Sequence, residues 1–518
     1  MDILLLRPIP ANERWGLGPF FRVEPLGMEY IGAALIARGH RPTIVDLRFG
    51  DLKTWLRRTR ARLVGIACMH ALEYGDCVKL ARDIRRLAPD VTIIIGGHAS
   101  AAYPKPLFDP AVDAVVVDDG ESSVPAIVEA LEKKRPLTEV PGLWARTADN
   151  TFIETPAPAE RTTLDAVPLP ARELVERHRN EYMVVTERPI YLLETARGCP
   201  FRCSFCSIWQ LYDRSFRERS IDNVVRDFEL VGDKIFIADD LFWHRTARSR
   251  ELARALKKKG IKKDWFLVQT RTDLVARHAD LLEEWRPLAN RIDIFFGLEA
   301  PSDDGLDNYS KDSSTAATRE ACKVARSMGY GITGNFMVDP NWDEAQFQQL
   351  WDFVAENQLW RAGYTIHTPL PGTKEWAHWE STVGHQPWAK WDMHHLLWQP
   401  KLGTRRFFEL FAETWRRSVL NMGNQDAGKR MWNWFKQLEI DQIPQLVKVM
   451  LQTQRIMNAK AYEKEHQQFE RMAPVRKAPP PRTELDESRN QTTEAQQLVN
   501  IDTSRRTAKV PADARDIS

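Results

Sequence analysis

The sequence predicts an α/β protein with two successive sheet-and-helix units, a doubly wound parallel sheet and then a partial barrel, followed by an α-helical region. Two series of short β-branched runs alternate with amphipathic helical segments, which is typical of parallel sheets covered by helices. A Pro-rich stretch separates the two series. After the second series, eight tryptophans lie between residues 376 and 434. This last region is predicted to be α-helical and rich in aromatic residues.

The first series predicts a domain over residues 1–140. Its strand candidates are 2–6, 41–47, 62–67, 91–95 and 113–117, and helical patterns lie near 28–38, 51–61, 76–88 and 121–134. Doubly wound sheets bind their ligands beyond the carboxyl ends of the strands. Three of those ends read "GIACMHA", "IGGHAS" and "VDDGES", and they supply the candidate binding residues Cys68, Met69, Gly96, Gly97, His98, Gly120 and Glu121. Gly96 and Gly97 either let the backbone approach a ligand closely or merely form a tight turn.

Residues 141–188 are rich in proline and are predicted to be a linker. The second series has strand candidates at 190–195, 234–238, 265–270, 292–297, 331–338 and 362–367, with helical patterns near 221–231, 247–259, 273–286, 314–328 and 343–356. Six such units predict a partial barrel over 189–373, with its chemistry at the carboxyl ends of the strands. The aromatic-rich residues 374–470 are predicted to be helical. Residues 471–518 are polar and Pro-rich, and we expect them to be disordered.

The composition excludes several classes of protein. The 518 residues carry a formal net charge of +2, with both signs mixed along the chain, so nothing favours nucleic acid as a partner. Six cysteines are too few for a disulfide framework in a chain of this length. The start lacks the pattern of a secretion signal, and no apolar stretch approaches the length of a membrane span. We therefore expect a cytoplasmic protein whose reduced thiols are free to hold a metal.

Three of the six cysteines lie within eight positions, in "ARGCPFRCSFCSIWQ" (196–210), directly after the first barrel strand. Their spacing is C-x3-C-x2-C, at Cys199, Cys203 and Cys206. A structural zinc site normally takes four protein ligands, and no other cysteine belongs to a second closely spaced pair. An iron–sulfur cluster held by three thiolates leaves one iron open to an exogenous ligand. We favour a [4Fe–4S] cluster over zinc or a chance grouping.

The cysteine motif, with the aromatic Phe205 before its last cysteine, resembles the radical S-adenosylmethionine (SAM) family. The resemblance implies that SAM binds the open iron through its amino and carboxylate groups, and that one electron cleaves it to a 5′-deoxyadenosyl radical. It also implies SAM contacts at Ala238, Asp239 and Asp240 in "FIADD", at Glu299 in "GLEA" and at Asn335 in "GITGNFMV". Without the resemblance, Glu299 would be interpreted as a surface ion-pair partner.

A doubly wound domain ahead of such a barrel, with "GGH" after its fourth strand, resembles the cobalamin-binding subgroup of that family. The resemblance implies a flavodoxin-like cobalamin-binding domain, a partial (βα)6 radical SAM barrel and an α-helical C-terminal region. "TPLPGT" (368–373) is also typical of this subgroup. One departure concerns the loop "RPIPANERWGLG" after the first strand, which lacks the cobalt-ligating histidine of the D-x-H-x-x-G motif. His70 and His98 are interpreted as polar contacts, so cobalamin is expected base-off with no histidine below the cobalt.

A cluster, SAM and cobalamin together suit the methylation of an unactivated carbon. The stretches 20–35, 335–354 and 367–376 resemble hopanoid C-3 methylases, which implies an apolar polycyclic lipid as substrate. This also implies an electron donor such as flavodoxin or ferredoxin, and peripheral contact with the inner membrane, which we look for in the tryptophan-rich region 376–434. Two alternatives stay open. One is a methylase or anaerobic cyclase of bacteriochlorophyll synthesis acting on a tetrapyrrole, and the other is a cobalamin-dependent sensor whose barrel is only structural.

Overall fold

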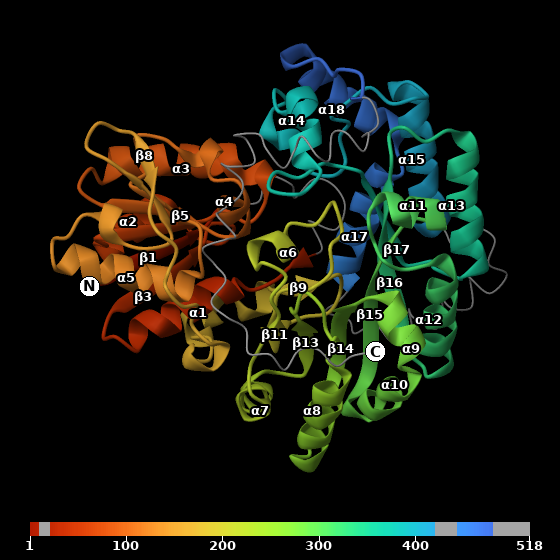
Figure 1. Cartoon of the computed structure of the whole chain (residues 1–518), viewed down its shortest axis with the longest axis horizontal. Coiled ribbons are helices and arrows are strands. Elements are labelled where there is room, and N and C mark those ends of the chain that lie inside the picture. Colours follow the sequence, from red (N-terminus) through yellow and green to blue (C-terminus); the bar gives the residue numbers. More distant parts are fainter. Residues whose placement is uncertain (10–20, 420–442, 480–518) are drawn as a thin grey trace.

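The computed structural model describes residues 1–9, 21–419 and 443–479, and Figure 1 shows its arrangement. The first sheet contains five parallel strands in the order β3-β1-β4-β5-β6. Their bounds are β1 Asp2–Arg7, β3 Arg41–Asp46, β4 Leu63–Ala67, β5 Thr92–Gly96 and β6 Ala114–Val116. The helices between them are α1 Leu26–Ile36, α2 Leu52–Thr59, α3 Tyr74–Leu87, the short α4 His98–Ala102 and α5 Gly120–Glu132. The predicted doubly wound, flavodoxin-like fold is confirmed.

The first sheet is buried on both faces, which explains why its strands are continuously apolar. Successive side chains of a strand point to opposite faces. Ile3 and Leu5 therefore lie in one core, which contains residues of α1 and α5. Leu4 and Leu6 lie in another core, which contains residues of α3 and three tryptophans of the C-terminal region.

The segment 141–188, predicted to be a linker, adds two strands to this sheet. β7 Leu143–Arg146 pairs antiparallel with β6, and β8 Phe152–Glu154 pairs antiparallel with β7. Leu143 and Ala145 are fully buried, while Trp144 and Arg146 between and after them are partly exposed. This alternation is the pattern of a strand with one covered face. The linker prediction is therefore wrong for residues 143–154.

The second sheet contains six parallel strands in the order β10-β13-β14-β15-β16-β17, which is the predicted partial barrel. Their bounds are β10 Tyr191–Leu193, β13 Lys234–Ile237, β14 Lys263–Thr270, β15 Ala289–Glu299, β16 Gly331–Val338 and β17 Ala362–Ile366. The helices are α7 Ile221–Leu230, α8 Thr246–Lys258, α9 Thr272–Arg277, α10 Ala279–Trp285, α11 Asp303–Asn308, α12 Thr315–Ser327 and α13 Glu344–Glu356. The helix predicted near 273–286 is divided at His278, whose backbone is not helical.

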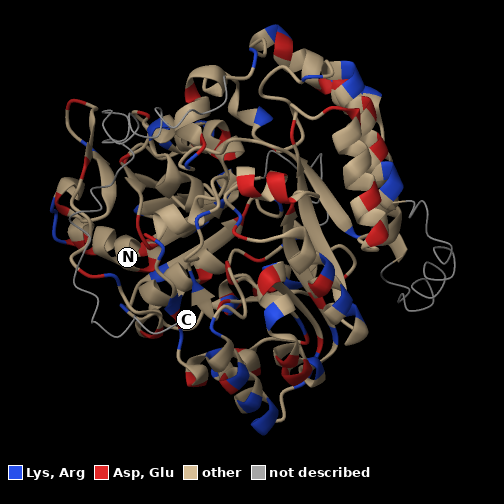
Figure 2. Cartoon of the chain, turned by 45° about the vertical axis from the view of Figure 1, so that its right-hand side comes forward, with Lys and Arg blue, Asp and Glu red and all other residues tan. Residues whose placement is uncertain are grey.

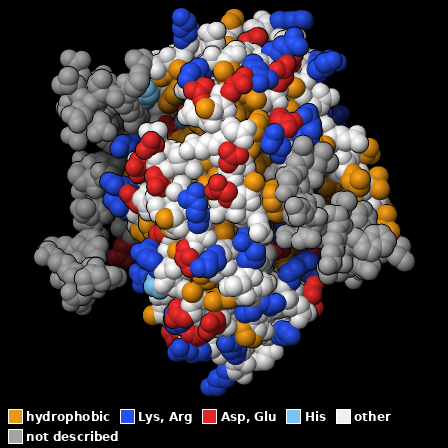
Figure 3. All heavy atoms as spheres, turned by 90° about the vertical axis from the view of Figure 1, so that its right-hand side faces the viewer, with side chains coloured by type: hydrophobic (Ala, Val, Ile, Leu, Met, Phe, Trp, Pro, Cys, Tyr) orange, Lys and Arg blue, Asp and Glu red, His pale blue; other side chains and the backbone are white. Residues whose placement is uncertain are grey.

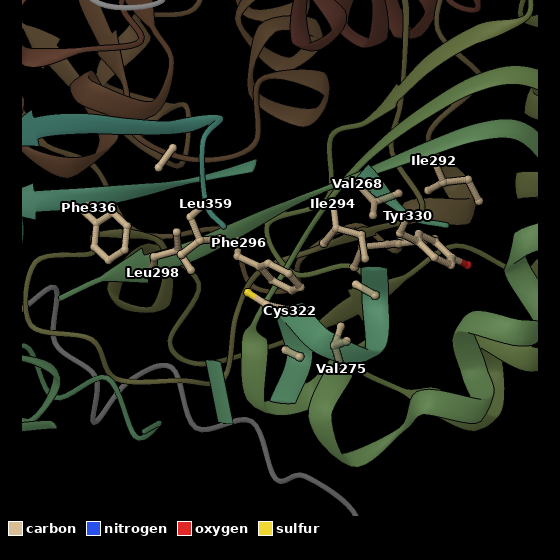
Figure 4. Close-up of a cluster of buried hydrophobic side chains, with 14 of the residues drawn as sticks. Val268, Val275, Ile292, Ile294, Phe296, Leu298, Cys322, Tyr330, Phe336 and Leu359 are labelled. Atoms are coloured by element: carbon tan, nitrogen blue, oxygen red, sulfur yellow. The ribbon is translucent and has the colours of Figure 1, made fainter. Parts of the chain in front are cut away.

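The barrel strands and their outer helices enclose a large hydrophobic core, part of which is shown in Figure 4. Cys322 of α12 lies in this core beside Phe296 and is 1% exposed. Burial raises the pKa of its thiol to about 11. Cys322 is therefore a core residue of α12 and takes no part in the cysteine motif.

The C-terminal region is helical, as predicted, with α14 Trp376–Val383, α15 Thr404–Val419, α17 Ile443–Ile456 and α18 Ala459–Met472. None of the six tryptophans described between residues 376 and 415 is exposed. Trp379 and Trp398, for example, pack with their ring centroids 4.1 Å apart. The expected tryptophan surface is therefore not formed by these residues, whereas Trp432 and Trp434 lie outside the described part.

The tail predicted to be disordered begins inside the described structure. Residues 471–479 contain the end of α18, and the backbone of Arg476 bridges to Trp398 and accepts a hydrogen bond from the Gln399 amide. The prediction of disorder is therefore wrong for these nine residues. Residues 480–518 lie outside the described part.

The carboxyl ends of the two sheets meet in the middle of the molecule (Figure 1). His98, after β5, bonds to Ser207 in the loop that follows β10. The space beside Gly372, after β17, is so tight that a Cβ there would lie 2.5 Å from the carbonyl oxygen of Ala102 in α4. The two units also share a core, because barrel residues such as Leu192 pack with residues of α1. Both edges that bind ligands in α/β folds thus face the same region.

Charges of both signs are mixed over the outer helices (Figure 2), and the face shown in Figure 3 carries the same mixture. Within the residues that the structure describes, no helix is long and apolar enough to cross a membrane.

Candidate cofactor-binding site

The cysteine motif lies in a loop whose start is fixed by a small β-ribbon. β11 Ala196–Arg197 pairs antiparallel with β12 Arg217–Glu218, and Gly198 follows with φ +101°. A Cβ at Gly198 would collide with the carbonyl oxygen of Ser215, so both the dihedral angle and the space require glycine here. The Cys203 carbonyl then accepts hydrogen bonds from the Cys206 amide at 3.2 Å and from the Trp209 indole at 2.9 Å. The short helix α6 Ile208–Leu211 ends the loop.

The three thiols of this loop lie in a low-polarity environment. Burial raises the pKa of each, and that of Cys206 reaches about 12. Thiolates therefore persist here only when positive charge, such as that of iron ions, is bound to them. Among the described residues, no three His, Cys, Asp or Glu side chains gather closely enough to hold a single metal ion. A four-iron cluster has a different requirement, because each cysteine sulfur binds a different iron.

Two buried cations lie beside Cys203, and the sequence reasoning missed both. Arg271, directly after β14, places its Nη1 4.0 Å from the Cys203 sulfur. Lys311 lies close enough to Cys203 to lower the pKa of that thiol, although burial dominates. Arg271 and Lys311 are 5% and 6% exposed. Positive side chains here match the negative charge of an iron–sulfur cluster with thiolate ligands, so the residues present fit such a group.

Glu299 ends β15 in an unusual backbone conformation. Its φ is +60°, which a residue with a side chain rarely adopts, and the strand pairing shifts register between Gly297 and Glu299. The Glu299 carboxylate is buried and accepts from the Lys311 ammonium at 2.8 Å. A Cβ at Gly297 would collide with this carboxylate, so the glycine makes room for the ion pair. Such strain at the carboxyl end of a barrel strand is typical of a functional position.

Phe205 lies next to this pair. Its ring is 5.7 Å from that of Tyr309 in an edge-to-face arrangement, and the Lys311 ammonium lies 6.0 Å from the Phe205 centroid. Ser204, the residue before it, donates a hydrogen bond of 2.6 Å to Glu375, which also pairs with His367 at 2.7 Å. The cysteine loop is thereby tied to the segment that follows β17.

The acidic pair after β13 holds the start of the cysteine loop. Asp239 accepts hydrogen bonds from the amides of Thr195 and Ala196 and from the Thr195 hydroxyl. Burial raises its pKa to about 7. Asp240 accepts from the Gly198 amide at 2.8 Å, and although the residue is exposed, burial of its carboxyl group raises the pKa to about 6. The carboxylate of Asp239 is therefore used by the start of the cysteine loop, whereas that of Asp240 has one bond to it.

Ala238 and Asn335, the two remaining residues expected to contact SAM, form hydrogen bonds within the barrel sheet. Ala238 continues the end of β13, and its amide donates to the Leu193 carbonyl at 2.8 Å. The Asn335 side-chain amide, on β16, donates to the Thr365 hydroxyl at 2.8 Å. The backbone of Ala238 is thus used by the sheet, and the Asn335 side-chain oxygen lies beside Gly363 of β17, 3.1 Å from where a Cβ would be.

In the first domain, the loops after β4 and β5 pack tightly against each other. Gly97 has φ +122°, and a Cβ there would lie 2.6 Å from the Cys68 carbonyl oxygen and 3.1 Å from the Met69 sulfur. A Cβ at Gly96 would lie 3.3 Å from Val116. Cys68 is fully buried, while Met69 is 46% exposed. The packing of the chain itself therefore requires Gly97 and leaves little room for a side chain at Gly96, and Met69 beside them is exposed.

His98, Gly120 and Glu121 link elements of the protein. The His98 imidazole bonds to the Ser207 hydroxyl at 2.7 Å, and burial lowers its pKa to about 4. Gly120 lets α5 approach Ile31 of α1, which a Cβ would meet at 2.7 Å. Glu121 accepts from Arg197 of β11 at 2.7 Å. His98 and Glu121 thus join the first domain to the cysteine loop. The loop after β1, where the cobalt-ligating histidine is lacking, lies mostly outside the described residues.

Comparisons with known proteins agree with this geometry. Residues 193–354 match the radical SAM superfamily, and residues 20–128 match the B12 binding domain. The chain is 29% identical over 403 residues to the hopanoid C-3 methylase of Methylococcus capsulatus, with 76% of each chain covered. It is 25% identical over 367 residues to the anaerobic magnesium-protoporphyrin IX monomethyl ester cyclase of Rubrivivax gelatinosus, covering 67% of this chain and 64% of the cyclase.

Among solved structures, the fold is similar to the cobalamin-dependent S-adenosylmethionine radical enzyme OxsB with aqua-cobalamin and SAM bound. The TM-score is 0.63 at 14% sequence identity, over 92% of this chain and 76% of that one. The radical SAM domain implies a [4Fe–4S] cluster and SAM, and the B12 binding domain implies cobalamin, so these are the cofactors of the chain. From its two matched domains, its fold and its relatives, this protein belongs to the cobalamin-binding radical SAM family and is a methyltransferase.

Proposed function

We propose that the protein methylates an unactivated carbon of an apolar polycyclic lipid, in the manner of a hopanoid C-3 methylase. The observation that carries this proposal is the 29% identity to that enzyme over 403 residues, or 76% of the chain. The likeness extends beyond the cofactor motifs that any member of the family needs.

In this proposal, Cys199, Cys203 and Cys206 hold the cluster at the meeting of the two sheets. When bound, the cluster, SAM and cobalamin supply the electron, the hydrogen-abstracting radical and the methyl group. The protein orients SAM with the carboxylate of Asp240 and with Glu299, which Lys311 holds in place.

Cobalamin is held by the loops after β4, β5 and β6, which contain Cys68, Met69, Gly96, Gly97, His98, Gly120 and Glu121. Contacts such as His98 with Ser207 keep these loops against the cysteine loop. This closure excludes water from the reacting groups.

A lipid substrate calls for contact with a membrane surface, and we place this contact at α17. Ile443, Val447, Met450 and Leu451 are between 49% and 62% exposed and lie on one face of the helix. Leu446, at the edge of this face, and Ile456, on the opposite side of the helix, are buried. The helix contains no acidic residue, so its outer face is compatible with an anionic lipid surface.

A tetrapyrrole is the second candidate substrate, favoured by the 25% identity to the magnesium-protoporphyrin ester cyclase. The reductant in either reaction is a small electron carrier such as a flavodoxin or ferredoxin. The sensor alternative requires no turnover of SAM.

The test is an anaerobic assay with the reconstituted protein, SAM, cobalamin and a chemical reductant. We expect 5′-deoxyadenosine and a methylated product with a hopanoid in liposomes, and neither product with Cys206→Ala. Met450→Glu should slow conversion in liposomes but leave conversion in detergent unchanged. Methylation or cyclisation of a tetrapyrrole instead would overturn the lipid substrate. Intact cofactors without any 5′-deoxyadenosine would favour the sensor.

A further inference from the structure

Arg271 lies at the carboxyl end of β14, and none of the assigned motifs includes it. Its guanidinium is buried and stacks on the ring of Phe201, with 3.7 Å between the guanidinium carbon and the ring centroid. Phe201 lies between the first two cysteines of the motif. The side chain therefore packs directly onto the cysteine loop.

The donors of Arg271 reach two other loops and the first turn of α9. Nη2 donates to the carbonyl oxygens of Lys311 at 2.6 Å and Asp312 at 2.7 Å. Nε donates to the Asp273 carboxylate at 2.7 Å, and Nη1 points to the Cys203 sulfur at 4.0 Å. A planar guanidinium can hold all these acceptors in fixed directions, whereas a lysine ammonium cannot. Arg271 thus sets the position of Cys203 relative to the backbone that carries Lys311.

The positive charge of Arg271 is not fully balanced by its carboxylate neighbour. Asp273 also pairs with Arg277 at 2.6 Å, so its single negative charge is shared between two guanidinium groups. Lys311, the other cation near Cys203, is paired with Glu299. Arg271 therefore contributes net positive charge beside a sulfur in a buried environment, where charge interactions are strong.

We propose that Arg271 positions Cys203 and tunes the reduction potential of the cluster bound to it. The inference rests on the proposed assignment of Cys203 as a cluster ligand. Reduction adds one electron from the external carrier and makes the cluster more negative. An N–H donor and a positive charge at one of its sulfurs stabilise that reduced state, so the potential becomes less negative.

The experiment compares anaerobically reconstituted wild-type protein with Arg271→Met and Arg271→Lys. Arg254→Gln is the matched control, since Arg254 is an exposed arginine of the outer helix α8 and pairs with Glu284. Iron per chain is measured first, followed by an EPR-monitored potentiometric titration of the cluster. We expect a more negative midpoint potential in Arg271→Met, a smaller shift in Arg271→Lys and no shift in Arg254→Gln.

Unchanged potentials in both Arg271 variants, with iron content retained, would overturn the proposal. If Arg271→Met fails to hold iron, the potential of Arg271→Lys alone decides, because that variant keeps the charge but loses the geometry. A shift of equal size in Arg254→Gln would assign the effect to the loss of any positive charge and not to Arg271, and would also overturn the proposal. Wild-type iron content in Cys203→Ala would instead contradict the ligand assignment on which it rests.

Discussion

Replacing Lys311 should show how strongly a buried Glu299 carboxylate without its cation lowers the free energy of unfolding. Replacing it with methionine leaves the Glu299 carboxylate buried without its cation, and removal of one partner of a buried pair typically costs about 3–5 kcal/mol. We expect Lys311→Met to lower the free energy of unfolding by about this amount, measured by urea denaturation. Lys401→Met is the control, because Lys401 and Asp343 form an exposed pair worth about 0–1 kcal/mol. Equal losses in the two variants would contradict the assigned role.

Single residues differ in how far the sequence could predict them. The cysteine motif is recognisable because its three members are neighbours in the chain. Arg271 and Lys311 are not, because they come from other loops and reach Cys203 only through the fold. Asp239 was predicted to contact SAM, but its oxygens are bonded to the start of the cysteine loop. Sequence position alone does not show which way a carboxylate at a strand end points.

At the scale of elements, the ribbon β11–β12 depends on Gly198. Alanine there combines an unfavourable positive φ with a collision against the Ser215 carbonyl, so the cysteine loop must move. We expect Gly198→Ala to bind clearly less iron on reconstitution than wild type. Gly260→Ala is the matched control, because Gly260 also has positive φ, at +69°, but has no heavy atom within 4 Å of its Cβ position. If both variants bind iron like wild type, the ribbon does not position the ligands.

Strands and helices with a regular hydrophobic pattern were predicted well, whereas elements that form only by pairing or packing with a neighbouring element were not. All six barrel strands and the five strands of the first domain appear where β-branched runs alternate with helices. β7 and β8 were missed because they are short and lie beside Pro-rich sequence, and they exist because β6 offers an edge to pair with. The apolar outer face of α17 was also missed, since aromatic content drew attention to tryptophans that the fold buries.

At the scale of the whole molecule, the two domains cannot act as independent bodies. Glu24, before α1, is fully buried and pairs with Arg179, and it accepts from the Leu192 amide of β10 at 2.5 Å. Separating the domains would expose this carboxylate site together with the shared core. The tryptophan-containing C-terminal layer adds to the same unit, because it packs on the first sheet and on the barrel.

That C-terminal layer should make the stability of the whole chain sensitive to acid. Burial lowers the pKa of His394 to about 4 and of His466 to about 3, from an ordinary value of 6.5. Below pH 6.5 these histidines bind protons in the unfolded chain but not in the folded one. The free energy of unfolding therefore falls by about 1.4 kcal/mol per pH unit per histidine until the folded pKa is reached. Asp239, with its raised pKa, acts in the opposite direction over about pH 4–7.

Thermal melts between pH 7.5 and pH 4.5 therefore separate these effects when variants are compared. On acidification, the melting temperature of His466→Phe should fall less than that of wild type. His385→Ala, at an exposed histidine, should follow wild type. An unchanged slope in His466→Phe would show that His466 titrates alike in the folded and the unfolded chain, and would contradict its lowered pKa.

The meeting of the two strand edges has one more consequence, which concerns the peptide dipoles. Each helix that follows a parallel strand begins at the carboxyl end of that strand, and its amino end carries partial positive charge. Because both sheets turn this edge to the same region, the amino ends of helices from both domains converge there (Figure 1). The region is therefore favourable for anions, such as phosphate groups, carboxylates or a thiolate-bound cluster, before any side chain is counted. A sulfonium ion has to be held there against that field, and we propose Asp240 and Glu299 as the carboxylates that do so.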